Sequence, residues 1–148
     1  MNKVEGFLDS YVAAWRAHPQ AGGPEGTEAM DRLLAVMTDD VRYVDVAARS
    51  VHVGHAQVAE MARAAYAFSR DLVFDIRSVQ GDGTRFAIEW EMQGTHTAGF
   101  GGPGPDGGTG RRFAVRGVSV GEIAPDGRAS GHRDYWNVAD FLGQVGLR

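Results

Sequence analysis

Apolar residues near the start of the chain recur at helical spacing. They lie three or four positions apart between residues 4 and 16, which predicts one face of an amphipathic helix: Val4, Phe7, Leu8, Tyr11, Val12 and Trp15. We expect Pro19 to end this helix, because proline has no N–H with which to continue it, and residues 20–26 to form a Gly/Pro loop. Thr27 can cap a second helix that runs to Met37.

A short strand and a third helix follow. Asp39 and Asp40 are typical of a turn. Residues 41–46 are β-branched and aromatic, which predicts a short strand. After Gly54, apolar positions again recur at helical spacing and predict a helix over residues 55–69.

From residue 72 onward the pattern changes to an alternation with period two. Phe86, Ile88, Trp90 and Met92 alternate with polar or small residues, as in a strand with one buried face. Turn signals at residues 81–83 and 125–127 separate neighbouring strands. The pattern predicts strands over residues 72–79, 86–92, 113–123 and 128–136, and a short closing helix over residues 138–145.

Helices that precede a run of long antiparallel strands are typical of an α+β fold. We expect the 148 residues to form a single domain, 1–148, with helices packed on one face of a curved sheet. An apolar pocket between the two layers is then the expected ligand site.

The composition excludes several kinds of site. The chain has no cysteine, which rules out disulfides, thiolate nucleophiles, iron–sulfur clusters and cysteine zinc sites. Its net charge is −4 and it has no basic tract, which argues against a nucleic-acid partner. It has no apolar run near the ~20 residues that cross a bilayer, and its N-terminus lacks a secretory signal. We therefore expect a cytoplasmic protein without a membrane partner.

Residues 99–110 are unusually rich in glycine. Seven of the twelve residues are glycine, and Pro103, Pro105 and Asp106 lie among them. The segment is too long for a hairpin turn, so we expect either an ordered lid or a mobile loop. It lacks the residue order of a phosphate-binding loop and does not run from a strand into a helix, which argues against that function.

His132, Asp134 and Trp136 form the first candidate site. On a regular strand they share one face, and Arg133 and Tyr135 share the other. A carboxylate beside an indole at a pocket wall is partly desolvated, which raises its pKa and suits it to proton transfer. The alternative is that His132 and Asp134 face solvent and Tyr135 fills the core.

Asp45 and Tyr11 are two further candidates. Asp45 shares a face with Tyr43 inside an apolar strand, where an acid is unusual unless it is paired or functional. The alternative is an aspartate at the strand's end that caps the following turn. Tyr11 lies on the apolar face of the first helix, where its hydroxyl can donate to an enolate-like oxygen or simply pack with its tip in water.

His96 is the last candidate. It extends the buried face of the strand before it, either as a ligand-binding residue or as a hydrogen-bonded core residue. The remaining histidines, His18, His52 and His55, have no metal-ligand spacing with a carboxylate, so we expect no metal site.

Three stretches of the sequence carry a resemblance to a known family. They are Gly94-Thr95-His96-Thr97 with Thr109-Gly110-Arg111, then Asp126-Gly127-Arg128 leading to His132-Arg133-Asp134-Tyr135-Trp136-Asn137, and finally Phe141-Leu142-Gly143-Gln144-Val145-Gly146. Together they resemble the SnoaL-like polyketide cyclases of the nuclear transport factor 2-like superfamily. The resemblance covers nearly the whole chain and is most specific in its last third.

The resemblance implies a cone-shaped fold, in which a strongly bent mixed sheet wraps around helices, and a homodimer formed through the sheet. It implies a small apolar or polyketide-like substrate, and neither a metal nor an organic cofactor. It implies Asp134 as the acid/base and His132 as its partner, with Asp45 as a proton shuttle and Tyr11 as an oxyanion donor. The residues then expected to bind substrate are Tyr11, Trp15, Tyr43, Trp90, His96 and Trp136.

The chain also departs from the family pattern at two places. Asn137 stands where the cyclases often have an aspartate; it can still cap the last helix but cannot exchange a proton. The loop after Thr97 is longer than usual, which is consistent with a different substrate or a gated pocket.

Three functions are consistent with these observations. The leading one is a cyclase-like enzyme that closes a ring by aldol chemistry on an apolar carbonyl compound. The second is an epoxide hydrolase or a ketosteroid-type isomerase of the same fold. The hydrolase needs Asp134, Arg133 and Asp45 in one pocket, although neighbours on a regular strand point to opposite sides. The third is a non-catalytic binding module, whose pocket would either hold no buried acid or be filled by Trp90, Trp136 and Met92.

Overall fold

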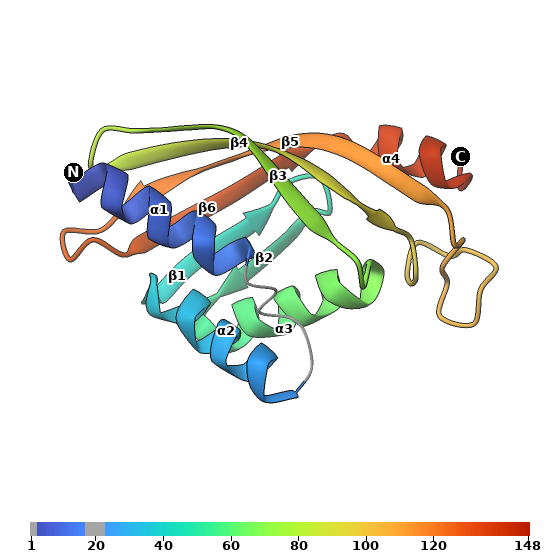
Figure 1. The fold of residues 1–148 in the computed structure, drawn as a ribbon, viewed down its shortest axis with the longest axis horizontal. Coiled ribbons are helices and arrows are strands. Elements are labelled where there is room, and N and C mark those ends of the chain that lie inside the picture. Colours follow the sequence, from blue (N-terminus) through green and yellow to red (C-terminus); the bar gives the residue numbers. More distant parts are fainter. Residues whose placement is uncertain (1–2, 17–22) are drawn as a thin grey trace.

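The computed structural model describes residues 3–16 and 23–148, so the predictions for Pro19 and for residues 20–22 lie outside the described part. The described residues form four helices and a six-stranded sheet (Figure 1). In chain order the elements are α1 (Lys3–Arg16), α2 (Gly23–Ala35), β1 (Met37–Asp45), β2 (Ser50–Val53), α3 (Gly54–Phe68), β3 (Val73–Gly81), β4 (Arg85–Thr95), β5 (Arg112–Ile123), β6 (Ala129–Trp136) and α4 (Val138–Val145).

The sheet is mixed, with the order β2-β1-β6-β5-β4-β3. Strands β3 to β6 form an antiparallel meander, and β1 pairs with β2 in the same antiparallel sense. Only the β1–β6 pair is parallel among the described strands, and it joins the first strand of the chain to the last. The α+β class predicted from the order of helices and strands is confirmed.

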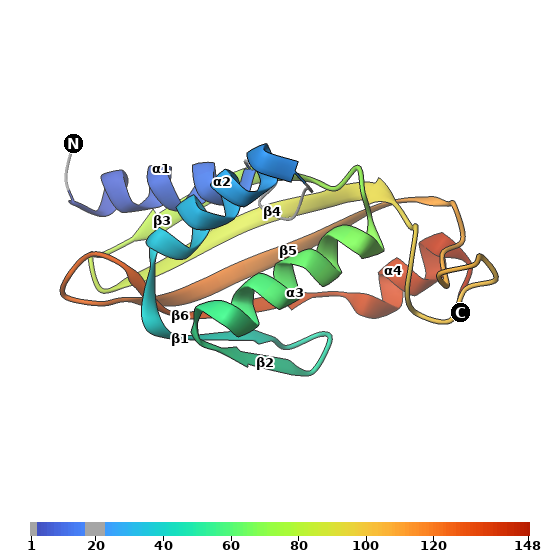
Figure 2. The ribbon, with the colours of Figure 1, turned by 90° about the horizontal axis from the view of Figure 1, so that it is seen from below.

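Helices α1, α2 and α3 lie on one side of the sheet, and α4 packs near one end of it (Figure 2). The alternation along β4 places Phe86, Ile88, Trp90 and Met92 in the core. On the helix side the core contains Tyr11 of α1, among other apolar residues at helical spacing. The apolar faces that the helical and strand patterns predicted therefore pack together in one hydrophobic core.

The first half of the chain differs from the prediction at two boundaries. Helix α2 begins at Gly23 rather than at Thr27, with Pro24 in the first turn, where a missing N–H leaves no hydrogen bond unmade. Met37 is not helical, because it begins β1, where it pairs with Ala129 of β6.

The predicted turn at Asp39 and Asp40 is also wrong, since both residues belong to β1. The pairing of β1 with β6 shifts register between Met37 and Arg42, and both aspartate side chains are exposed there. Such an irregularity lets two successive polar residues face water within a strand.

At the other end of the chain, Asn137 caps α4 as expected, because its side-chain oxygen accepts a hydrogen bond of 3.0 Å from the Asp140 N–H. None of the helices in the described ranges is both long and apolar enough to cross a membrane.

Candidate active site

A cavity of about 350 Å³ lies between the helices and the sheet. Its walls come from α1, α3 and all six strands, and most of the lining side chains are apolar or aromatic. The polar lining side chains gather on the wall built by β1, β2, β5 and β6, and they are Tyr43, Asp45, Ser50, His52, Ser119, His132 and Asp134. A largely apolar pocket with a few converging polar groups is the usual form of a small-ligand site.

Strand β6 turns its alternate residues into this cavity. His132, Asp134 and Trp136 line it, whereas Tyr135 on the opposite face is 42% exposed. Arg133 also lies on the opposite face, where its guanidinium donates hydrogen bonds of 2.7 and 3.0 Å to the Glu122 carboxylate. The predicted face is therefore correct, and the alternative with Tyr135 in the core is wrong.

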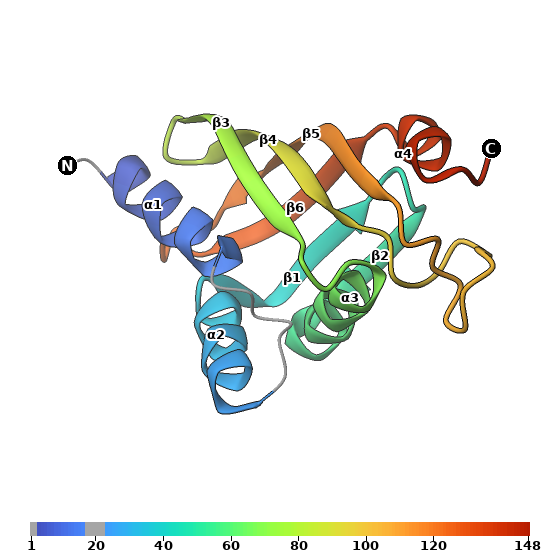
Figure 3. The ribbon, with the colours of Figure 1, turned by 45° about the vertical axis from the view of Figure 1, so that its right-hand side comes forward.

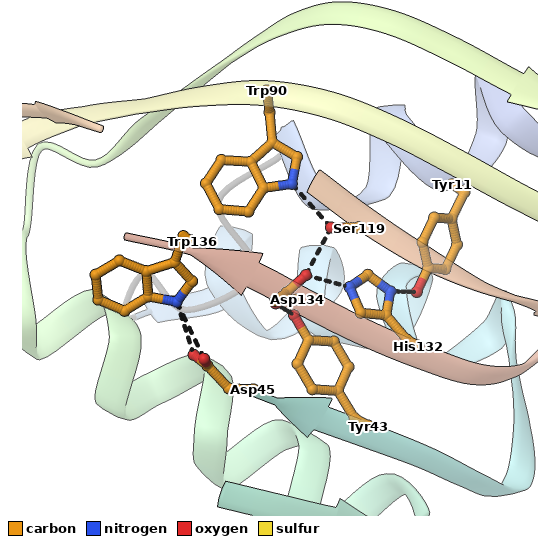
Figure 4. Close-up of polar contacts among 8 residues, drawn as sticks. All are labelled: Tyr11, Tyr43, Asp45, Trp90, Ser119, His132, Asp134 and Trp136. Carbon is orange, nitrogen blue, oxygen red and sulfur yellow. Dashed lines mark hydrogen bonds and ion pairs between the residues drawn. The ribbon is translucent and has the colours of Figure 1, made fainter. Parts of the chain in front are cut away.

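A continuous chain of hydrogen bonds runs along the buried wall (Figure 4). The Trp90 indole N–H donates to Ser119 Oγ at 2.8 Å, and Ser119 donates to Asp134 Oδ1 at 2.6 Å. The same Asp134 oxygen lies 2.6 Å from His132 Nε2, and His132 Nδ1 lies 2.5 Å from the Tyr11 hydroxyl. The chain connects α1 to three strands of the sheet and fixes the orientation of each polar group in it.

Tyr43 adds a third hydrogen-bond donor to Asp134. Its hydroxyl donates to Asp134 Oδ2, and its ring stacks on the His132 imidazole with the ring centres 4.2 Å apart. Both contacts follow from the parallel register, which places Tyr43 beside His132 and Asp45 beside Asp134 on the same face. The Asp134 carboxylate thus accepts hydrogen bonds from three side chains on three different strands.

The pKa of Asp134 lies below its ordinary value, contrary to the expectation of a raised one. Burial raises this pKa, but the charge and hydrogen bond of His132, together with the hydrogen bonds from Ser119 and Tyr43, outweigh the burial. The prediction considered only desolvation beside an indole. Because the donors stabilise the anion, Asp134 remains ionised at neutral pH.

The pKa of Asp45 shifts in the opposite direction. Burial raises it and the charge of Asp134 raises it further, against hydrogen bonds from the Ala48 N–H and the Trp136 indole. These bonds are 3.0 Å long from each donor to Asp45 Oδ1. Asp45 therefore caps the turn after β1, as the alternative predicted, and it also faces the cavity and is paired with the Trp136 indole.

Tyr11 and His96 are both completely buried, but of the two only Tyr11 lines the cavity. The Tyr11 side chain is completely buried and its hydroxyl is bonded to His132, so its tip does not reach water. Burial raises the pKa of this hydroxyl well above its ordinary value, so it remains protonated. His96 is also completely buried, but it does not line the cavity and instead bonds the Gly-rich loop, as a hydrogen-bonded core residue would.

The cavity lining also includes Ser50, His52, Phe100 and Ser119, none of which was predicted as a site residue. Ser50 and His52 belong to β2, which was not predicted, and they share a hydrogen bond of 3.1 Å. Ser119 was recognisable only as a polar residue inside an apolar strand. Of the other residues expected at the site, Trp15, Trp90 and Trp136 line the cavity.

Comparison with known proteins gives a family and a fold. The family model of the SnoaL-like domain matches residues 8–132. No curated protein sequence matches the chain.

Three solved structures illustrate the structural likeness. A candidate SnoaL-like polyketide cyclase from Jannaschia sp. CCS1 has a TM-score of 0.80 and 13% identity, with 100% of this chain and 96% of that chain covered. A protein with a ketosteroid isomerase-like fold from Catenulispora acidiphila DSM 44928, solved with trimethylamine, has a TM-score of 0.72 and 20% identity, with 96% and 93% covered. A candidate hydroxylase, AclR from Streptomyces galilaeus, has a TM-score of 0.72 and 18% identity, with 99% and 97% covered. At these identities the likeness establishes the fold and not the reaction.

Proposed function

Because the chain belongs to the family of SnoaL-like domains, we propose that it is an enzyme that moves a proton on an apolar carbonyl compound held in its cavity. The resemblance noted from the sequence is confirmed by the family match, and the nuclear transport factor 2-like fold by the structural likeness. Family and fold leave the reaction open, so the proposal rests on the polar wall of the cavity.

The observation that carries the proposal is the pair of carboxylates Asp45 and Asp134. They lie side by side on neighbouring strands, face the same cavity and have pKa values shifted in opposite directions. Such a separation makes Asp45 the more readily protonated of the two carboxyl groups, while Asp134 remains an anion. This division favours Asp45 as the group that transfers the proton, whereas the resemblance pointed to Asp134.

In the proposed reaction, Asp45 takes a proton from the carbon next to the carbonyl group. The C–H bond breaks and an enolate forms, whose oxygen accepts a hydrogen bond from Ser50 or His52. The enolate carbon attacks a second carbonyl group of the same molecule, a C–C bond forms, and Asp45 returns its proton to the new alkoxide. The product is a ring-closed isomer of the substrate, so no co-reactant is needed.

The remaining polar residues support this step without contacting the proton. Asp134 stays ionised, and its charge adds to the burial that raises the pKa of Asp45. Tyr11 and His132 are buried and share a hydrogen bond, and His132 in turn bonds Asp134. The two side chains therefore act as positioning residues that hold Asp134 in place.

A ketosteroid-type isomerase is the second candidate, and the raised pKa of Asp45 is the observation that favours it. The first proton transfer is the same, but Asp45 then returns the proton to a different carbon of the enolate, so that a double bond moves. The two reactions differ only in whether the bound molecule offers a second carbonyl group to the enolate.

The other two functions considered for the chain receive less support. The epoxide hydrolase arrangement needs Arg133 in the cavity, but Arg133 pairs with Glu122 on the opposite face of the sheet. A binding module without catalysis would need no buried acid, yet both Asp45 and Asp134 line the open cavity.

Deuterium exchange tests the proposal without knowledge of the natural substrate. The protein is incubated in D₂O with 2-acetylnaphthalene, and loss of the methyl proton signal is followed by NMR. We expect exchange above the buffer rate, a rate that rises with pH through an apparent pKa above 3.8, and loss of the enhancement in Asp45→Asn.

The matched control is Asp39→Asn, which removes an aspartate of the same strand whose side chain is 90% exposed. It should exchange at the wild-type rate. Full activity in Asp45→Asn, or a bound ketone that does not exchange, would contradict the proposal.

A further inference from the structure

The Gly-rich loop between β4 and β5 holds one aromatic residue in an unusual backbone conformation. Gly99, Phe100 and Gly101 are three successive residues with positive φ, at 81°, 61° and 73°. Glycine adopts this region freely, but for a bulky residue it is sterically unfavourable. A residue kept in such a conformation is commonly fixed by its surroundings for a functional reason.

The Phe100 ring lies where the loop meets the cavity. It lines the cavity and is also 46% exposed to solvent, so it occupies the boundary between the two. Its ring centre lies 5.8 Å from that of Phe68 on α3 and 5.1 Å from that of Phe141 on α4. In this way the loop adds an aromatic wall between two helices that do not belong to the polar site.

His96 holds this part of the loop in place from beneath. Its Nε2 lies 3.1 Å from the carbonyl oxygen of Gly99, the residue before Phe100. Its Nδ1 accepts from the Thr109 N–H at 3.2 Å and lies 3.1 Å from the Thr109 hydroxyl. Since Nδ1 accepts, Nε2 carries the hydrogen and donates to Gly99. One buried imidazole therefore connects the outgoing and returning ends of the loop.

The loop is also closely packed against itself. The Gly102 N–H donates to the Gly107 carbonyl at 2.7 Å, and the Gly99 N–H donates to the Asp106 carbonyl at 2.9 Å. A Cβ atom on Gly102 would lie 2.3 Å from the Gly107 carbonyl oxygen, and one on Gly108 would lie 2.3 Å from the Thr97 carbonyl oxygen. The glycines thus allow two backbone segments to approach closely, and the loop stands apart from the sheet in Figure 3.

We propose that Phe100 is the residue that limits the length of ligand this cavity accepts, and that His96 determines specificity indirectly by fixing the position of Phe100. The inference rests on the proposed function, in which the cavity binds an apolar carbonyl compound. It concerns the end of the cavity where Phe100 lies against Phe68 of α3, and none of the proton-transfer groups takes part in it.

The size of the cavity makes this wall important. About 350 Å³ lies near the lower end of the ~300–1,000 Å³ found for ligand sites, so one phenyl ring at its boundary decides whether another fused ring fits. Removing the ring opens this end to longer molecules. A larger indole at the same position closes it further.

The test measures binding of three neutral ketones of increasing length by quenching of tryptophan fluorescence. The ketones are acetophenone, 2-acetylnaphthalene and 2-acetylanthracene, and Trp90 and Trp136 in the cavity wall report their binding. We expect Phe100→Ala to bind 2-acetylanthracene about tenfold more tightly than the wild type does, equivalent to ~1.4 kcal/mol. The same variant should bind acetophenone no more tightly than the wild type does. Phe100→Trp should weaken the binding of 2-acetylanthracene more than that of the two shorter ketones.

Two further variants separate this role from a general effect. Tyr135→Ala removes an aromatic ring of similar exposure from the opposite face of the sheet and should leave all three affinities unchanged. His96→Gln should reproduce the selectivity of Phe100→Ala, and the double variant should show no additional change, because both substitutions release the same wall.

Unchanged relative affinities in both Phe100→Ala and Phe100→Trp would overturn this inference while leaving the proposed function intact. Additive effects of the His96 and Phe100 substitutions would refute the role of His96. If none of the ketones binds saturably to any of the proteins, the proposed function itself fails, and the inference fails with it.

Discussion

Replacing the two cavity carboxylates one at a time should have very different effects on stability. Asp134 accepts hydrogen bonds from His132, Ser119 and Tyr43, and its side chain is only 15% exposed. In Asp134→Asn one of the two acceptor oxygens becomes an NH₂ group, which faces donors that are themselves buried. Hydrogen bonds to a charged group contribute about 1.5–3 kcal/mol each.

We therefore expect Asp134→Asn to lower the free energy of unfolding by about 3 kcal/mol, at the lower end of the range for breaking a buried ion pair. For a chain of this length the melting temperature should fall by about 6–12 °C. Urea unfolding at pH 7, followed by tryptophan fluorescence, measures the free energy directly.

Asp45→Asn is the matched comparison, because the folded state raises the pKa of Asp45. A raised pKa means that the ionised form is less favourable in the folded chain than in the unfolded one. Removing the charge should leave stability at pH 7 unchanged or slightly increased, and the remaining amide oxygen can still accept from Ala48 and Trp136.

The pH dependence of the two variants provides an internal check on sign. The pKa of Asp134 is lowered on folding, so its contribution is present above about pH 3.9 and is lost as pH falls through its native pKa. The stability deficit of Asp134→Asn should therefore shrink in acid. The reasoning is refuted if Asp134→Asn is as stable as the wild type at pH 7, or if Asp45→Asn is the more destabilised variant.

Three further predictions concern individual contacts. Trp136→Phe removes a hydrogen bond that lowers the pKa of Asp45, so the pH profile of deuterium exchange should move to higher pH. An unmoved profile would contradict the assignment of Asp45 as the group that transfers the proton. Gly117→Ala would place a Cβ atom 2.3 Å from the Trp90 ring. We therefore expect the free energy of unfolding, measured in urea, to fall by about 1–3 kcal/mol, and ketone binding to weaken. Wild-type values of both quantities would show that the ring can move freely. The homodimer implied by the family resemblance would use the outer face of the sheet, where Tyr135 is 42% exposed. Tyr135→Arg should therefore lower the mass measured by sedimentation equilibrium to that of one chain. A monomeric wild type would refute the dimer.

The strongest periodic patterns predicted the elements that build the cavity. The alternation through Phe86, Ile88, Trp90 and Met92 gave β4 and its buried face, because a strand with one face in the core has a strict period of two. The same rule placed His132, Asp134 and Trp136 together on one face of β6. These are local properties of the chain, so a single sequence is sufficient to show them.

The features that were missed depend on contacts between distant segments. Strand β2 has only four residues and lies at the edge of the sheet, so its alternation is too short to recognise. The lowered pKa of Asp134 depends on Ser119 and Tyr43, which reach it from other strands. Spacing along β6 alone could show which way Asp134 points, but not which donors surround it.

The two carboxyl groups can be compared directly by a carbon-13 NMR titration of the aspartate side chains, with Asp45→Asn and Asp134→Asn used to assign the signals. The account predicts that Asp45 titrates above the ordinary value of about 3.9 and that Asp134 titrates below it. The reverse order, or two ordinary values, would contradict the claim that the cavity separates one proton-carrying carboxyl group from one permanent anion.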